Sequence, residues 1–382
     1  MKRSEVLHAW GTILTGRAPS MSIEITKECP LRCPGCYAYE DAHLGGGATL
    51  RQLSDHKGDD LVARVLALVD RERPLHLSIV GGDPLVRFRE LDALLPQLNQ
   101  RGIFVQVVTS AFRPIPLAWT ALDRLNVVVS IDGLPAEHDE RRKPATIARI
   151  LKNIAGHQVV VHATVTGQIM RRPGYLREFL EFWSPRPELR KMWISLFTPQ
   201  RNAPPAPEQL TPAERQRAIE ELLALRRLHP KLDMAAALIR EFARPPQTAD
   251  ECVFAKTTTI FSADLKTKVT PCQFGGDPDC TQCGCIASMG LAAVGNHKLA
   301  GVLPVRHIFN ASLAVGNLVS RFRAPSSTQQ PAPSAAPAAP VMPSDSVGAL
   351  LAAPVMLRPV SQVHAASPAD AVSVASADSA SL

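Results

Sequence analysis

Short hydrophobic segments alternate with amphipathic segments along the first half of the chain. The hydrophobic segments are rich in Val and Ile, as the buried strands of parallel sheets are. Six ranges are predicted as strands: Ser22–Glu28, His76–Gly82, Phe104–Ser110, Val127–Asp132, Val159–Thr166 and Met192–Phe197. Apolar residues at helical spacing predict helices between them, most clearly over Asp60–Asp70, Arg89–Asn99 and Tyr175–Trp183. This order predicts an α/β fold with a parallel sheet or a partial (β/α)6 barrel.

The remaining patterns divide the chain around this TIM-like barrel, which is assigned to residues 22–200. One helix is expected within residues 1–21, because apolar residues there share a helical face. A helical connector is expected over 201–250 and a small Cys-rich extension over 251–323. Residues 324–382 are mostly Ala, Pro, Ser and Val with few charges, which predicts a disordered tail.

The chain is basic, with 42 Lys and Arg against 35 Asp and Glu. This charge suits an anionic partner such as a nucleotide, a phospholipid or an acidic peptide, but no long basic run indicates nucleic acid. Neither a signal peptide nor an apolar run of about 18 residues is evident, so no membrane-spanning segment is expected. The eight cysteines form two tight groups, which favours metal binding in a reducing cytoplasm over disulfides.

The first cysteine group follows directly on the first predicted strand. Cys29, Cys33 and Cys36 are separated by three and by two residues. Three thiolates at this spacing can hold one cubane iron–sulfur cluster and leave its fourth iron open for a substrate or cofactor. The alternatives are a zinc knuckle, with His43 as the nearest further ligand, a disulfide with a spare thiol, or a chance arrangement.

This loop resembles the cluster-binding loop of radical S-adenosylmethionine (radical SAM) enzymes. In that superfamily, S-adenosylmethionine chelates the fourth iron of a [4Fe–4S] cluster. One electron from the cluster cleaves it to methionine and a 5′-deoxyadenosyl radical, which then attacks the substrate. The resemblance therefore implies both cofactors and an electron donor such as a flavodoxin or ferredoxin. Most members have an aromatic residue before the third cysteine; Gly35 stands there in this chain, and Tyr37 is the candidate for packing beside the adenine.

The sequence Gly81-Gly82-Asp83-Pro84 follows the second predicted strand and extends the resemblance. It resembles the Gly-Gly-Glu-Pro motif of the family, which implies that Gly81, Gly82 and Asp83 hold the methionyl ammonium group of S-adenosylmethionine. By itself the same sequence is also typical of a tight turn.

The end of the fourth predicted strand is a weaker match. Ser130 and Asp132 resemble the polar residues that approach the ribose and carboxylate of S-adenosylmethionine in the peptide-modifying branch of the family. An ordinary strand end with a turn explains them equally well. His162 lies in an apolar strand and is expected to be a hydrogen-bonded core histidine rather than a ligand.

The second cysteine group is large enough for a further metal site. Its members are Cys252, Cys272, Cys280, Cys283 and Cys285. Four of the five thiolates can complete a second cluster, and nearby glycines permit the tight turns that this requires. The region resembles the auxiliary-cluster segment that follows the barrel in many family members, which implies a second [4Fe–4S] cluster. A structural zinc ion, or a cluster with an open iron for the substrate, is the alternative.

These motifs predict a radical SAM enzyme with an unidentified substrate and with no assigned catalytic acid, base or hydrogen donor. Peptide or protein maturation is favoured by Ser130–Gly133 and by the second cysteine group. The alternative is adenosyl or similar transfer to an isoprenoid or other lipid, as in hopanoid synthesis. Gly35 and the apolar range Ile286–Val319 suggest it, since that range could be core helices or a surface that meets a membrane. A non-enzymatic alternative is a zinc-binding protein.

Overall fold

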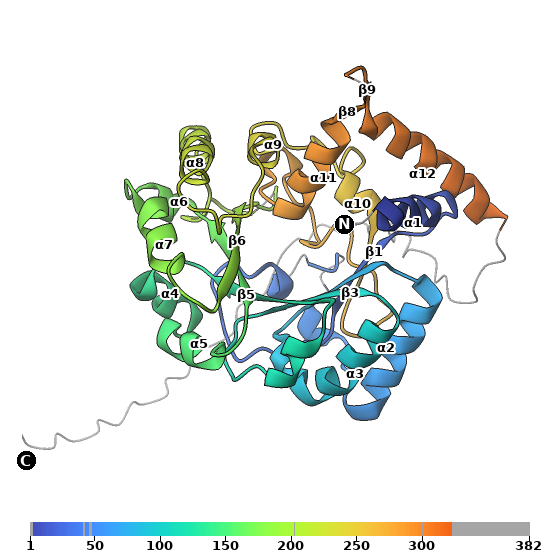
Figure 1. Ribbon diagram of the computed structural model, residues 1–382, viewed down its shortest axis with the longest axis horizontal. Coiled ribbons are helices and arrows are strands. Elements are labelled where there is room, and N and C mark those ends of the chain that lie inside the picture. The colour runs from blue at the N-terminus through green and yellow to red at the C-terminus, as the bar shows by residue number, and fades with distance from the viewer. Residues whose placement is uncertain (1–2, 41–42, 46–47, 202, 300, 323–382) are drawn as a thin grey trace, which may run out of the picture. The chain divides into compact units, whose positions relative to one another are not determined.

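A sheet of seven parallel strands is the centre of the structure (Figure 1). The computed structural model describes residues 3–322 apart from 41–42, 46–47, 202 and 300, so the predicted tail at 324–382 lies outside the described residues. The strands are β1 Ser20–Glu24, β2 His76–Val80, β3 Phe104–Thr109, β4 Leu125–Ile131, β5 Val159–Val165, β6 Leu189–Leu196 and β7 Thr258–Phe261. Their order is β6-β5-β4-β3-β2-β1-β7, and the sheet is not closed.

All six predicted strands are confirmed, with small differences at their ends. The seventh strand, β7, was not predicted. It lies within the range 251–323 that was assigned to the Cys-rich extension, and it pairs with β1, Ser20 opposite Thr258. The extension therefore contributes a strand to the sheet of the barrel. The described residues of both parts belong to one compact unit.

Helices that follow the strands cover the outer side of the sheet, as Figure 1 shows. They are α2 Gly58–Glu72, α3 Phe88–Gln100, α4 Pro135–Arg142, α5 Ile147–Asn153, α6 Gly167–Met170 and α7 Tyr175–Trp183. The side chains that face them are apolar: Met21 and Ile23 of β1 and Leu77 and Ile79 of β2 are at most 1% exposed. Burial of this face is the main hydrophobic contribution to the fold.

The inner face of the sheet carries polar side chains, although the composition of the strands indicated apolar strands. Side chains alternate between the two faces of a strand, so Ser22, Ser78 and Gln106 lie side by side on neighbouring strands. Ser130 of β4 lies opposite His162 of β5 on the same face. Valines of β3, β4 and β5 lie on the same face, so the interior of the barrel is mixed rather than wholly apolar.

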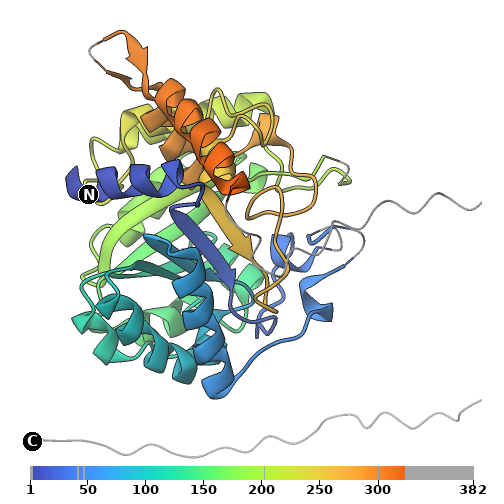
Figure 2. The same ribbon diagram turned by 90° about the vertical axis from the view of Figure 1, so that its right-hand side faces the viewer.

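The helices of the second half of the chain continue from α6 and α7, with α8 beside them and the others farther along (Figure 1). They are α8 Pro212–Leu225, α9 Ala236–Glu241, α10 Val253–Thr257, α11 Ile286–Asn296 and α12 Val305–Arg321. A short hairpin of β8 Lys298–Leu299 and β9 Leu303–Pro304 joins α11 to α12. Helix α12 packs against the N-terminal helix α1, Arg3–Leu14, so the two ends of the folded part lie side by side (Figures 1 and 2).

Candidate active site at the carboxyl ends of the strands

The loop after β1 carries Cys29, Cys33 and Cys36, and all three thiols are free and half-buried. The loop has no regular structure until the short 3-10 helix η1, Tyr37–Tyr39, begins after Cys36. Leu31 anchors the loop in the core, where it is 2% exposed, and its backbone N–H donates to Cys29 Sγ at 3.4 Å. Leu31 thus attaches the loop to the core, while the three thiols stay partly accessible to solvent.

Cationic side chains hold the base of this loop. Glu28 accepts from Arg87 at 2.9 Å and pairs with Lys57 at 2.7 Å, and hydrogen bonds from both lower the pKa of Glu28 to about 2. Arg87, which follows β2 in the 3-10 helix η3 (Pro84–Arg87), also pairs with buried Asp55 at 2.8 Å. The residue directly before Cys29 is therefore tied to the segment after β2.

The glycine turn after β2 lies in contact with the cysteine loop. Gly81 and Gly82 have φ values of +79° and +47°, which favour glycine. A Cβ on Gly82 would lie 2.2 Å from the carbonyl oxygen of Glu28, so no larger residue fits without movement. The backbone N–H of Asp83 donates to the same oxygen at 2.9 Å. The first two predicted motifs therefore meet at one rim of the sheet.

The Asp83 carboxylate joins the ends of β2 and β3. Its Oδ1 accepts from the Thr109 hydroxyl at 2.7 Å and from Leu85 N–H at 3.0 Å. Its Oδ2 accepts from the Ser110 N–H at 2.8 Å and from the Ser110 hydroxyl at 2.5 Å. Asp83 is 2% exposed. Its carboxylate thus has a structural role in the turn, and its predicted contact with the methionyl ammonium group stays a prediction.

The segment after β4 reaches the same loop through two arginines of α4. Asp132 pairs with Arg142 at 2.6 Å and with Arg141 at 2.9 Å. Burial raises the pKa of Asp132, but the charges of Arg142 and Arg141 outweigh it and lower the pKa to about 2. Arg141 also donates to the Pro34 carbonyl at 2.6 Å and pairs with Glu208 at 3.0 Å. The Asp132 carboxylate is therefore neutralised within the chain.

Burial raises the pKa of all three thiols, that of Cys29 to about 12. The positive charge of Arg142 opposes this rise at Cys33 and Cys36. Without a metal these thiols hold their protons at neutral pH, and bound iron would displace them. Arg142 places a fixed positive charge beside the thiolates that would result.

The donor set of this loop suits an iron–sulfur cluster. Three thiols, one N–H to sulfur and a partly buried cation all favour an anionic metal group. Among the residues that the structure describes, no three His, Cys, Asp or Glu side chains are gathered closely enough for a single metal ion. A cubane needs a different arrangement, because each thiolate binds a separate iron.

Ser130 and His162 lie on the polar inner face below this rim. Ser130 is half-buried, and His162 Nε2 contacts the hydroxyl of Ser195 on β6 at 2.8 Å. Burial lowers the pKa of His162 to about 4, so the ring is neutral at physiological pH. His162 is thus hydrogen-bonded within the sheet, as the sequence suggested for a core histidine.

Gly35 and Tyr37 differ in their surroundings. Gly35 has φ +63°, a conformation in which an aromatic residue would be strained. A Cβ there would lie 3.9 Å from the ring of Phe197, directly after β6. Tyr37 packs against Phe274 and His43, each at a ring-centroid distance of 5.6 Å. Tyr37 therefore contacts the C-terminal region, and its predicted place beside the adenine stays a prediction.

The second cysteine group surrounds one cavity. All five members line it: Cys252, Cys272, Cys280, Cys283 and Cys285. The loop that carries Cys283 is tied to the end of β6, where Gly284 exchanges hydrogen bonds with Leu196 and Thr198 at 2.9 and 2.8 Å. The cavity therefore brings together five cysteines, of which the first and the last are 33 positions apart in the sequence.

A buried polar network links the two cysteine groups. His43 Nε2 contacts Glu24 Oε1 at 2.7 Å, and both side chains are fully buried. His43 Nδ1 lies 3.0 Å from the Phe274 carbonyl, two residues after Cys272, so that nitrogen must carry a proton. The second carboxylate oxygen accepts from the Ser262 hydroxyl at 2.6 Å. This pattern places a hydrogen-bonded His43–Glu24 pair that joins β1, the segment after β7 and the second cysteine group.

The His43 pair predicts a pH dependence of stability. Burial lowers the pKa of His43, but the bond to Glu24 outweighs it and the pKa is raised above 6.5. A raised pKa stabilises the fold fully below the unfolded value and loses that contribution as the pH rises through the folded value. We expect the wild type to lose more stability between neutral and alkaline pH than His43→Gln does. Thermal unfolding across this range measures the difference, and parallel curves for the two proteins would contradict the assignment.

Several residues of the site were not singled out in the sequence. Glu24 was passed over, although a lone acid on the inner face of a strand is an available signal. Arg141 and Arg142 were not singled out either. Their importance depends on where α4 places them, beside the cysteine loop.

Comparisons with known proteins give one family model and several solved structures. The family model described as "Radical SAM superfamily" matches residues 23–174. Streptococcus suis SuiB bound to S-adenosylmethionine is 16% identical, with 68% of this chain and 60% of that chain covered and a TM-score of 0.46. SuiB bound to its precursor peptide SuiA is 16% identical, with 83% and 70% covered and a TM-score of 0.47. Native anSMEcpe with bound AdoMet is 12% identical, with 79% and 99% covered and a TM-score of 0.48.

A comparison with curated protein sequences gives no significant match. The chain spans about three fifths of the length of the S-adenosylmethionine-bound SuiB structure. The matched family segment begins in β1 and extends to the residue before α7, so it contains the cysteine loop, the glycine turn and the arginines of α4. Residues 23–174 therefore form a radical SAM domain, and members of that superfamily carry a [4Fe–4S] cluster.

Proposed function

We propose that Cys29, Cys33 and Cys36 ligate the [4Fe–4S] cluster and that the enzyme modifies a peptide or protein. The observation that carries the first part is the contact between the cysteine loop and the glycine turn, where Asp83 N–H donates to the Glu28 carbonyl. When bound, the cluster supplies one electron for the reductive cleavage of S-adenosylmethionine. A flavodoxin or ferredoxin is the proposed electron donor.

The residues of the chain bind and orient the cofactor in this proposal. Gly81 and Gly82 bring the turn against Glu24 and Glu28, where a Cβ would not fit, and their backbone is proposed to hold the methionyl part. Arg142 offers its charge to the cluster or to the cofactor carboxylate. Ser130 is the polar group proposed to contact the ribose. Asp132 acts through the two arginines, since both already pair with its carboxylate.

The polar side chains on the inner face of the sheet support a peptide substrate over an isoprenoid. Ser78, Gln106 and Ser130 offer hydrogen-bonding groups on that face. A peptide backbone can satisfy such groups, whereas an apolar chain would leave them unpaired at a cost in free energy.

We further propose that four of the five cysteines around the second cavity hold an auxiliary [4Fe–4S] cluster. Their common cavity supports this assignment, and burial raises the pKa of Cys272, Cys283 and Cys285 to about 12. Thiols of this kind need a metal charge to ionise. The Glu24–His43 pair would hold this cluster region in a fixed position against β1.

Purification without oxygen tests the proposal. We expect a brown protein with about eight iron and about eight sulfide per chain for two cubanes. After reduction it should form methionine and 5′-deoxyadenosine from S-adenosylmethionine. A peptide fraction, but not the same fraction after protease treatment, should couple this cleavage to consumption of the substrate. A colourless, zinc-loaded protein would contradict the enzymatic proposal, and coupling by a lipid fraction alone would contradict the peptide substrate.

A further inference from the structure

Helix α12 exposes an apolar face. Four residues form it, with exposed fractions from 40% to 83%: Val315, Leu318, Val319 and Phe322. Their spacing of three and four residues places them on one side of the helix. A single exposed apolar residue is ordinary, but a contiguous row on one helix face indicates a contact surface.

This apolar face is not needed to attach α12 to the fold. A different side of the helix packs on α1, where Trp10 stacks on Phe309 at 5.7 Å and donates to the Ser312 hydroxyl at 2.8 Å. Gly316 lies against the backbone of Ile13, where a Cβ would come within 2.1 Å of the carbonyl oxygen. Helix α12 therefore has one side that packs on α1 and a second, apolar side that no other described residue covers.

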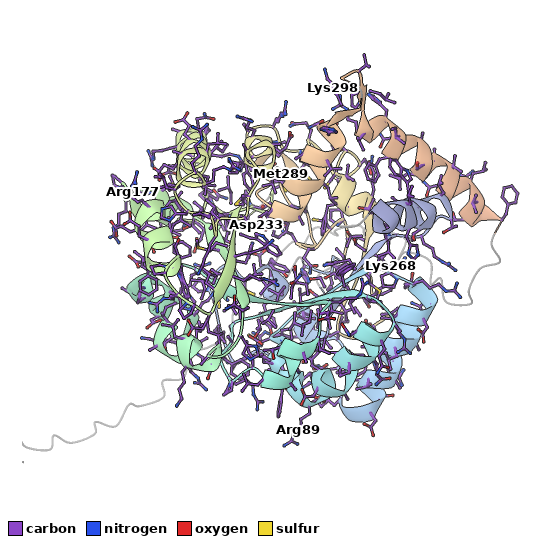
Figure 3. The ribbon with its side chains drawn as sticks, viewed as in Figure 1. Arg89, Arg177, Asp233, Lys268, Met289 and Lys298 are labelled. Atoms are coloured by element: carbon purple, nitrogen blue, oxygen red, sulfur yellow. The ribbon has the colours of Figure 1, made fainter. Side chains whose placement is uncertain are left out.

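The hairpin at the start of α12 exposes more apolar surface. Val302 and Leu303, at and beside its turn, are 79% and 48% exposed. Figure 1 shows this hairpin projecting from the rest of the fold, and Figure 3 places Lys298 on it. An apolar tip next to a cation is typical of segments that enter the interface of a membrane.

The net positive charge of α12 and the hairpin favours an anionic partner. Residues 286–323 contain no Asp or Glu, although the whole chain has 35, and they contain Lys298, Arg306, Arg321 and Arg323. A second copy of this chain, docked through the same surface, would bring these cations against one another. An anionic lipid bilayer offers negative charge at its surface and an apolar layer beneath it.

We propose that α12 and the β8–β9 hairpin dock on a membrane that contains anionic lipids. The helix would lie in the interface, with its apolar face among the acyl chains and its arginines near the headgroups. No helix among the described residues is long and apolar enough to cross a membrane. This docking does not depend on the proposed substrate, because the surface lies on α12 and not at the rim of the sheet.

Sedimentation of the full chain with vesicles tests this proposal. We expect binding to vesicles of equal parts phosphatidylcholine and phosphatidylglycerol, weaker binding at high salt, and little binding to phosphatidylcholine alone. Leu318→Glu should lower the partition coefficient at least about tenfold, because it places a charge on the apolar face. Asn317→Glu is the matched control, since it adds the same charge to an exposed position on another side of the helix.

Three outcomes would overturn the proposal. The first is the absence of binding to the anionic vesicles while the protein is folded by circular dichroism. The second is equal loss of binding in Leu318→Glu and Asn317→Glu, which would mean that net charge alone is responsible. The third is a wild-type dimer that Leu318→Glu dissociates, which would assign the apolar face to a second copy of the chain.

Discussion

Replacing Cys33 with alanine is expected to abolish cleavage of S-adenosylmethionine. One of the three proposed thiolate ligands is lost, and the two that remain cannot hold a cubane with a single open iron. Because loss of residues that merely support metal ligands costs 10- to 100-fold, loss of a ligand should cost more than about 100-fold. The measurement is formation of 5′-deoxyadenosine by the reduced, reconstituted protein, together with its iron content, which should fall by about four per chain.

Cys272→Ala is the control for this experiment. It removes a thiol from the second group and should leave cleavage of S-adenosylmethionine in the absence of substrate close to the wild-type rate. A Cys33→Ala protein that keeps its full iron content and cleaves S-adenosylmethionine normally would show that Cys33 is not a ligand. We expect the Cys33→Ala protein to fold, because Cys33 is half-buried and its replacement leaves no large cavity. Circular dichroism checks this.

Glu24→Ala is expected to lower the free energy of unfolding by about 3–5 kcal/mol, the usual cost of removing one partner from a buried ion pair. The change leaves the ring of His43 and the hydroxyl of Ser262 without the carboxylate that lies 2.7 and 2.6 Å away. Both groups are fully buried, so water cannot replace the carboxylate without local opening. Denaturant unfolding of the wild type and the variant measures the effect.

Asp70→Ala provides the comparison for an exposed ion pair. Asp70 pairs with Arg101 at 3.1 Å, and their side chains are 60% and 35% exposed. Such pairs contribute no more than about 1 kcal/mol. Equal losses in Glu24→Ala and Asp70→Ala would show that the buried pair does not stabilise the fold as proposed. A native-like iron content at the second cysteine group in Glu24→Ala would show that the pair does not position that region.

The strand and helix pattern was predictable from the sequence where periodicity is strong. The helix predicted over Tyr175–Trp183 has those ends in the structure, because its apolar residues recur at helical spacing without interruption. Strand β7 was missed because Thr258–Phe261 is only four residues long and lies among cysteines and turns. Its place beside β1 results from pairing between segments more than two hundred residues apart.

The candidate site divides in the same way. Cysteine spacing and the double glycine are local features, so the sequence by itself determined the resemblance to the superfamily and the position of the proposed cluster loop. Only the tertiary structure decided that the carboxylate of Asp83 is taken up by Thr109, Leu85 and Ser110, and that Arg142 lies beside the cysteine loop. The pairing of Glu24 with His43 was decided in the same way. Such contacts join residues whose separation along the chain gives no periodic signal, and burial then makes their charges and hydrogen bonds count.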